Sequence, residues 1–283
     1  MRVRGSRYRG ASVRSLRHAA GRRPTVRAIT DLRPVARVIA ALTRGTLFRE
    51  WARFVACELA GVQRTDRYRL REGGIVVWMR HNTPDLDVLS EVFLDADYEP
   101  PVELGGLAPA RILDLGANVG LFGAWALARW PGAAVDAYEP DPANAAVHQR
   151  TVAANPGLRW VLHEAAAAAA PGELRFAAGG FATSGQVDDG ANGLAVRAVD
   201  VLPAMAGADL VKIDIEGGEW ALLTDPRLRD AARVLVLEYH PRLAPQPDAR
   251  ACALALLQRA GYATHERFHD EHNGHGMLWA WRG

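Results

Sequence analysis

The sequence has little lysine, little cysteine and no long apolar stretch. The last two shortages argue against a disulfide framework and against a transmembrane segment. Lysine occurs once, at position 212, among 34 basic residues. The two cysteines, Cys57 and Cys252, fit no disulfide framework and no metal-ligand spacing, which favours a reducing compartment such as the cytoplasm. No apolar run approaches the ~18–20 residues needed to span a bilayer, so we expect no transmembrane segment.

The charge is distributed unevenly along the chain. Residues 1–45 contain 12 Arg and a single acid, Asp31, and so carry +11; because the whole chain carries +2, the remainder carries −9. We expect residues 1–44 to form a basic, disordered tail, since they show no sustained apolar period. A nucleic-acid or membrane anchor and an organellar transit peptide are the alternatives for such a segment.

The sequence predicts a small lid over residues 45–105, followed by the main domain over residues 106–283. The apolar spacing and turn residues of the first region indicate two helices and a hairpin. The expected elements are a helix over 47–62, a hairpin of 68–71 with 75–79, and a helix from Pro84 to about Leu94 that Thr83 caps.

Strands and helices alternate beyond residue 106, which predicts a doubly wound, mostly parallel α/β sheet. The expected strands are 112–115, 134–138, 158–162, 210–213 and 234–238, and the expected helices are 120–130, 142–153, a short one from Glu219, and 248–260. Residues 165–200 interrupt this order with a hairpin-like insertion, strands 173–177 and 194–198, around a loop at 179–193. Strands 262–265 and 276–281 predict a terminal hairpin.

The segment ILDLGANVG, residues 112–120, carries the strongest functional signal. A strand ends in Asp114, and a tight turn of Gly116, Asn118 and Gly120 leads into a helix. This element presents backbone amides to a nucleotide-like ligand, and Glu139, at the end of the next strand, can accept both hydroxyls of a ribose. An acid just before the turn would repel a pyrophosphate but suits an ammonium, which favours S-adenosylmethionine (SAM) over NAD.

A second group of polar residues follows in DLVKIDIEGGEW, residues 209–220. Residues two apart share a face of a strand, so Lys212, Asp214 and Glu216 are expected to point the same way. The two acids come at the carboxyl edge, where open α/β sheets bind ligands, and Glu238 and His240 end the next strand at that edge. A salt bridge with Lys212 is the structural alternative for the acids, and a capping or packing role is the alternative for His240.

The turn between the last two strands is rich in histidine. It contains His265, His269, His272 and His275 with Asp270 and Glu271. A divalent metal is conceivable there, but a polar, solvated turn is the simpler interpretation. If the penultimate strand is parallel to its sheet, the turn lies on the active-site edge and substrate contact becomes possible.

Taken in order, these motifs resemble the FkbM family of SAM-dependent methyltransferases. The similarity covers roughly Arg80 to His265 and depends on RHNTPDLDVLSEVF, Tyr98, DLGANVG, YEPDPAN, AVDVLP, DLVKIDIEGGE and LEYH. It implies the seven-stranded, Rossmann-like class I methyltransferase fold. The basic tail and the histidine-rich turn depart from the family pattern and inherit no role.

The resemblance also implies a role for individual residues. Asp114, Gly116, Asn118 and Gly120 would hold the methionine end of SAM, Glu139 would bind the ribose, Pro140 and Asp141 would shape that wall, and Glu164 and Ala165 would lie near the adenine. Asp214 and Glu216 would line the transfer site.

The implied reaction is methylation of a hydroxyl on a small molecule, such as a secondary metabolite or a sugar. A neutral His240, or Asp214 with a raised pKa, is the expected general base, and Lys212 would keep the acids ionised or stabilise an alkoxide. A divalent metal held by Asp214, Glu238 and His240 is an alternative that we do not favour. RNA methylation anchored by the basic tail and non-catalytic SAM binding are further alternatives; the acidic main part argues against nucleic acid. The oligomeric state and the acceptor do not follow from the sequence.

Overall fold

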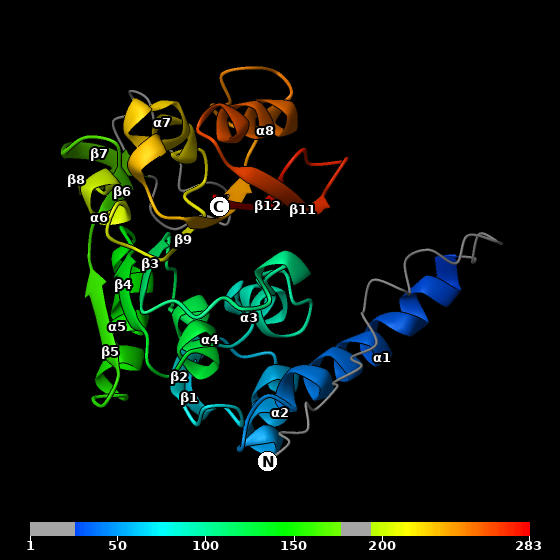
Figure 1. Ribbon diagram of the computed structural model, residues 1–283. Helices are drawn as coiled ribbons and strands as arrows, with labels where there is room; N and C mark the ends of the chain where they lie inside the picture. Colours follow the sequence, from blue (N-terminus) through cyan, green and yellow to red (C-terminus); the bar gives the residue numbers. More distant parts are fainter. Residues whose placement is uncertain (1–25, 177–193) are drawn as a thin grey trace, which may run out of the picture.

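A seven-stranded sheet forms the centre of the protein (Figure 1). The structure is a computed structural model and describes residues 26–176 and 194–283. Its strand order is β11-β12-β10-β9-β3-β4-β5. The strands are β3 (Arg111–Leu115), β4 (Ala134–Tyr138), β5 (Arg159–His163), β9 (Leu210–Ile213), β10 (Val234–Tyr239), β11 (Ala263–His269) and β12 (Gly276–Trp281). All neighbours are parallel except β12, which is antiparallel to both β10 and β11. The predicted fold class, a doubly wound and mostly parallel seven-stranded sheet, is confirmed.

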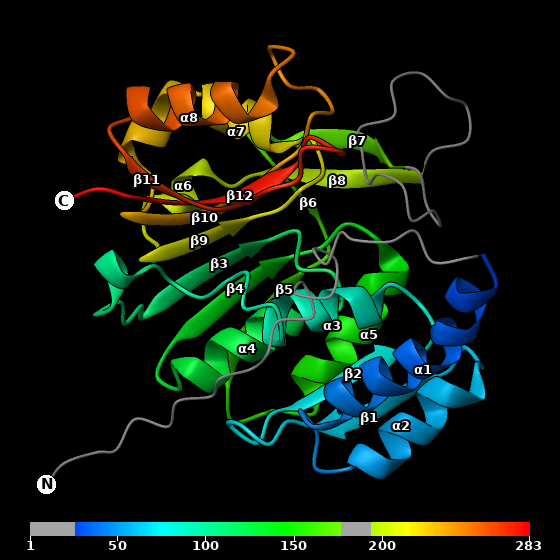
Figure 2. The same ribbon diagram turned by 90° about the vertical axis from the view of Figure 1, so that its right-hand side faces the viewer.

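Helices cover both faces of this sheet (Figure 2). On one face lie α3 (Asp85–Phe93), α4 (Leu121–Arg129) and α5 (Pro142–Ala153); on the other lie α6 (Leu202–Met205), α7 (Glu219–Thr224) and α8 (Ala249–Arg259). Two short 3-10 helices, Val102–Leu104 and Pro226–Asp230, complete the connections. Alternate residues of β3 divide between the two cores, with Ile112 on the α4 side and Leu113 and Leu115 on the α7 side. Burial on both faces explains why the central strands are almost continuously aliphatic.

The N-terminal region packs outside α4 and α5 rather than over the carboxyl edge of the sheet. It consists of α1 (Val26–Gly45), α2 (Trp51–Ala60), β1 (Thr65–Arg69) and β2 (Val76–Arg80). Thr151 and Asn155 at the end of α5 accept hydrogen bonds from the backbone N–H groups of Trp78 and Val76, at 2.9 and 3.0 Å. The hairpin therefore lies beside α5 (Figure 2), and the role of residues 45–105 as a lid stays a prediction.

The prediction of a tail over residues 1–44 is corrected in part, since α1 begins at Val26. This helix docks on α2: Arg44 pairs with the buried Glu58 at 2.7 Å, and Arg37 donates to the Glu58 carbonyl at 2.9 Å. Arginine thus supplies specific tertiary contacts there, which an apolar period does not reveal. The rest of the predicted tail, residues 1–25, lies outside the described residues.

The interruption at residues 165–200 forms a small second sheet beside the main one. Its strands are β6 (Ala166–Ala168), β7 (Gly172–Phe176) and β8 (Leu194–Asp200), in the order β6-β8-β7. β7 and β8 pair antiparallel, which confirms the predicted hairpin. β6 was not expected from its alanine sequence. The predicted loop at 179–193 lies outside the described residues.

The last two strands place the histidine-rich turn. Because β11 and β10 are each antiparallel to β12, β11 runs parallel to β10 and ends at the same edge. The turn after His269 therefore lies at the carboxyl edge, as the parallel arrangement requires. Across residues 26–176 and 194–283, none of the helices is both long and apolar enough to cross a membrane.

Candidate functional site

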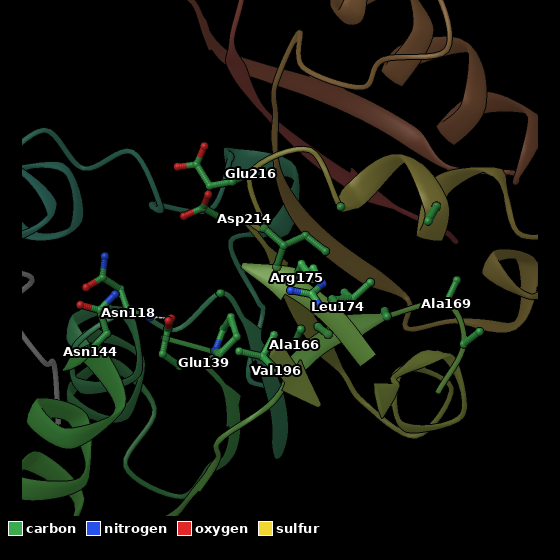
Figure 3. Close-up of a pocket in the computed structure, with 18 residues that line it drawn as sticks. Asn118, Glu139, Asn144, Ala166, Ala169, Leu174, Arg175, Val196, Asp214 and Glu216 are labelled. Carbon is green, nitrogen blue, oxygen red and sulfur yellow. Dashed lines mark hydrogen bonds between the residues drawn. The ribbon is translucent and has the colours of Figure 1, made fainter. Parts of the chain in front are cut away.

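A cavity of about 340 Å³ lies at the carboxyl edge of the sheet (Figure 3). Asn118, Glu139 and Asn144 form one side. The alanine segment 166–170 with Leu174 and Val196 forms the opposite, largely apolar side, which Arg175 also lines. Asp214 and Glu216 stand at a third side, above the glycine turn. The cavity thus has a polar end built from β3, β4 and β9, and an apolar end built from the small sheet.

The glycine turn is held tightly between its neighbours. Gly116 has a φ of +82°, and a Cβ there would lie 1.8 Å from the carbonyl oxygen of Asp214. Gly120 has a φ of +88°, and a Cβ there would come within 2.6 Å of the buried His148 ring. Only glycine combines this conformation with so close an approach. These contacts explain why the turn carries glycine at both positions.

Glu139 is buried at the end of β4 and braces the turn. Its two carboxylate oxygens accept hydrogen bonds from the backbone N–H groups of Asn118 at 2.7 Å and Asp141 at 2.8 Å. Burial outweighs these bonds and raises the pKa of Glu139 to about 7. A carboxylate has about four lone-pair positions, so two remain for a ligand in the cavity that Glu139 lines.

Lys212 lies behind the turn rather than in the cavity. It neighbours Asp114 across the β3–β9 pair. Its Nζ donates to the carbonyl oxygen of Gly116 at 2.6 Å and lies 3.4 Å from Asp114 Oδ1 and 3.2 Å from Asp214 Oδ2. Burial alone would lower the pKa of Lys212, but the charges of Asp214 and Asp114 raise it above its ordinary value. The ammonium thus donates to the Gly116 carbonyl and lies between the carboxylates of Asp114 and Asp214.

His240 is surrounded by carboxylates. Its Nδ1 donates to Glu219 Oε1 at 3.2 Å, and its Nε2 lies 3.6 Å from Glu216 Oε2 and 3.8 Å from Glu238 Oε1. Burial would lower the pKa of His240, but the bond to Glu219 and the charges of Asp214 and Glu238 raise it to about 10. This pKa favours the imidazolium form over the neutral His240 that we expected from the sequence. We refer to Asp214, Glu216, Glu238 and His240 as the acid–histidine cluster.

The cavity contains part of the predicted site. Among the predicted residues, Gly116, Asn118, Glu139, Pro140, Asp214 and Glu216 line it. The other predicted cofactor residues are not among the lining residues. Asp114 is fully buried beside Lys212, Gly120 begins α4, and Asp141 caps α5 by accepting from the N–H groups of Ala143 and Asn144. Glu164 is exposed, and Ala165 is fully buried behind the wall.

Sequence reasoning missed the apolar end of the cavity. Residues 166–170 are all alanine, and an alanine run has no polar signal that marks a site. Asn144 was matched as part of a motif without a role. It lines the cavity, and its Oδ1 accepts a hydrogen bond from Arg80 at 2.6 Å. Arg80 also forms an ion pair with Asp85 at 2.7 Å. The Arg80 and Asp85 positions of the motif thus have a structural purpose.

A second cavity, of about 180 Å³, opens beside the acid–histidine cluster. It lies between the end of α3, the segment 95–98, the end of β10 and the β11–β12 turn. From the histidine-rich turn, Asp270 and His275 line it. His269 instead meets the hydroxyl of Tyr239 at 2.9 Å. Two of the turn's polar residues therefore face a cavity rather than bulk solvent alone.

Two groups of side chains are close enough to share a metal ion within the described part of the chain. Asp214, Glu216 and His240 form one, with ligand atoms within 4.8 Å of one another, so Glu216 takes the place expected for Glu238. Cys57, Asp66 and His81 form the other, in the N-terminal region, although the cysteine spacing gave no sign of it. There the hydroxyl of Tyr68 already bonds His81 Nε2 at 2.7 Å.

Comparison with known proteins gives similarity of fold only. No protein-family model matches this chain, and no curated protein matches it in sequence. Precorrin-6y C5,15-methyltransferase from Geobacter metallireducens GS-15 has a TM-score of 0.39 and 16% identity, over 62% of this chain and 80% of its own. An O-methyltransferase family protein from Burkholderia thailandensis has a TM-score of 0.42 and 15% identity, over 70% of this chain and 58% of its own, which is less than two thirds.

The N-terminal domain of EvdMO1 with S-adenosylhomocysteine (SAH) bound is a third similar structure. Its TM-score is 0.38 and its identity 18%, over 62% of this chain and 75% of its own. The first two proteins are methyltransferases by their descriptions, the third is described with SAH bound, and the similarity to each is distant. Membership of the FkbM family stays a prediction.

Proposed function

We propose that this protein is a SAM-dependent methyltransferase that acts on a hydroxyl of a small molecule, such as a secondary metabolite or a sugar. One observation carries the proposal: a single cavity joins the glycine turn, Glu139, and the acids Asp214 and Glu216. When bound, SAM supplies an electrophilic methyl group on a positively charged sulfur. A cavity lined by three carboxylates and one guanidinium, that of Arg175, favours that cation over the pyrophosphate of NAD.

The residues of the cavity suit the parts of SAM. Glu139 has acceptor positions left for the two ribose hydroxyls. The segment 166–170 with Leu174 and Val196 offers an apolar wall for the adenine ring. Lys212 acts as a positioning residue, because it ties the Gly116 carbonyl to the two aspartates and so fixes the turn against β9.

For the base, we propose Glu238 in place of His240. A base must be free to take a proton, and His240 already carries one at neutral pH. Burial and the charge of Asp214 raise the pKa of Glu238 well above its ordinary value, which favours the protonated carboxyl. Once ionised, Glu238 is a stronger base than an ordinary carboxylate. His240, 3.8 Å away, carries the positive charge that favours ionised Glu238.

Metal assistance is the alternative chemistry for the same residues. An ion held by Asp214, Glu216 and His240 would compete with Lys212 for Asp214 and would have to displace the proton of His240. We therefore propose transfer without a metal. Turnover should survive dialysis against EDTA unchanged; loss on chelation with recovery on adding Mg²⁺ would establish the metal alternative.

The proposal is tested by calorimetry on the full chain at pH 8, with SAM, SAH and NAD as separate ligands. SAM and SAH should each bind at one site, and NAD should not bind. Radiolabelled SAM, mixed with a panel of hydroxyl compounds and with total RNA, then distinguishes the acceptor classes. Label in RNA would support the RNA alternative; NAD binding without SAM binding would end the proposal.

A further inference from the structure

Helix α1 exposes a continuous apolar stripe. Four of its large apolar side chains are each 40–54% exposed and follow one another at i, i+3, i+4 and i+7, which places them on one side of the helix. These are Val35, Val38, Ile39 and Leu42. On another side of α1, Arg37 and Arg44 contact Glu58 of α2. The stripe therefore faces away from α2, and the packing of the two helices does not account for it.

The stripe belongs to a larger concentration of exposed apolar residues. Among the residues that the structure describes, seven of the eleven exposed large apolar side chains fall between positions 35 and 62. Besides the stripe they are Trp51 and Leu59 of α2 and Val62, which follows that helix. Exposed apolar residues that are scattered singly need no explanation, but a concentration of this kind marks an interaction surface. We refer to these seven residues as the N-terminal apolar patch.

The charge of the same region is strongly positive. Residues 1–72 contain 18 Arg and five acids and carry +13; because the whole chain carries +2, residues 73–283 carry −11. Arg49 and Arg53, on either side of Trp51 in the sequence, are exposed. The patch thus lies in the basic end of a chain whose remainder is acidic. Its partner should therefore combine negative charge with an apolar phase.

An anionic membrane surface fits these requirements better than a second copy or a nucleic acid. Two copies that met through the same patch would bring two strongly positive regions together, which is unfavourable. A nucleic acid would attract the arginines but offers no apolar phase for the stripe. Anionic headgroups attract arginine, and the acyl region beneath them accepts apolar side chains. Tryptophan is enriched at this boundary, and Trp51 is 50% exposed.

We propose that the N-terminal apolar patch docks on the surface of an anionic membrane. Helix α1 extends outward from the rest of the molecule (Figure 1), so a flat surface can reach its stripe. The helix lies along the membrane plane, with the stripe among the headgroups and the first acyl carbons and the arginines of the region near the lipid phosphates. The acidic remainder is repelled by the same lipids, which gives the bound molecule one orientation. This proposal does not depend on the methyltransferase function, since the patch shares no residue with the 340 Å³ cavity.

The test is co-sedimentation of the full chain, at physiological salt, with vesicles of phosphatidylcholine alone and with equimolar vesicles of phosphatidylcholine and phosphatidylglycerol. The anionic vesicles should bind at least about tenfold more tightly. The double variant Ile39→Ser, Leu42→Ser should weaken that binding at least about tenfold, because two apolar side chains no longer enter the membrane. Val102→Ser with Val161→Ser removes side chains that are 89% and 50% exposed outside the patch, and this control should bind like the unaltered chain.

Urea denaturation of the same samples separates loss of docking from loss of folding, since all four substituted side chains are exposed and the free energy of unfolding should not change. Three results would overturn the proposal: no binding to anionic vesicles, equal binding to both kinds of vesicle, or unchanged binding by the Ile39→Ser, Leu42→Ser variant. Sedimentation velocity and binding of total RNA identify the other occupants. Self-association that the double variant abolishes, or RNA binding, in a chain that ignores the vesicles would assign the patch to a second copy or to nucleic acid and refute membrane docking.

Discussion

Replacing Glu139 by alanine separates the role of this carboxylate in cofactor binding from its role in stability. The ionised carboxylate is costly to bury: a pKa raised from 4.5 to about 7 corresponds to about 3 kcal/mol of lost stability at pH 8. The substitution removes that cost. It also leaves the N–H groups of Asn118 and Asp141 without their acceptor, at about 1–3 kcal/mol each. The two effects offset each other, so the free energy of unfolding should change little.

Cofactor affinity has no such compensation. Loss of the acceptor for the ribose hydroxyls should weaken SAH binding by about 1–3 kcal/mol, or roughly 5- to 150-fold. Calorimetry at pH 8 with SAH, adenosine and methionine localises the effect, because only ligands that contain ribose should respond. Glu164→Gln, an exposed acid just beyond β5, is the matched control. An unchanged affinity for adenosine in Glu139→Ala would refute the ribose assignment.

Three further predictions concern the same edge of the sheet. Gly116→Ala should lower the free energy of unfolding by at least about 2 kcal/mol in urea denaturation, through left-handed strain and the backbone clash, whereas Gly106→Ala, which meets nothing within 4 Å, should not. Lys212→Met should destabilise by about 3–5 kcal/mol, because it leaves the fully buried Asp114 without a counter-charge; a cost below 1 kcal/mol would contradict the ion pair. SAH affinity should fall about tenfold between pH 8 and pH 6, since Glu139 takes up a proton as pH falls through about 7; a flat profile would argue against that pKa.

The sequence predicted most of the framework because the framework follows local patterns. The aliphatic strands, the glycine turn and the alternation of Lys212 with its aspartate neighbours depend on residues close together in the chain. Boundaries moved by a few residues: the helix expected over 47–62 is α2, Trp51–Ala60. The N-terminal helix α1 was not predicted, because arginine contacts with Glu58 of α2 hold it in place and such contacts leave no periodic pattern in the sequence.

The parts of the site that sequence reasoning missed depend on contacts between distant segments. The raised pKa of His240 depends in part on its hydrogen bond with Glu219, which in sequence is an ordinary first-turn acid of a short helix. The second cavity is lined by residues of α3, of the end of β10 and of the last turn. The α3 residues and those of the last turn are more than 150 residues apart in the sequence. The alanine wall of the first cavity is recognised only once β6 pairs with β8.

The most direct test of the account is a crystal structure of the full chain with SAH. The account predicts that SAH lies in the 340 Å³ cavity, with its ribose hydroxyls on the Glu139 carboxylate, its adenine against residues 166–170, and its sulfur toward Asp214 and Glu216. SAH found elsewhere on the protein, or in this cavity with the ribose away from Glu139, would contradict it.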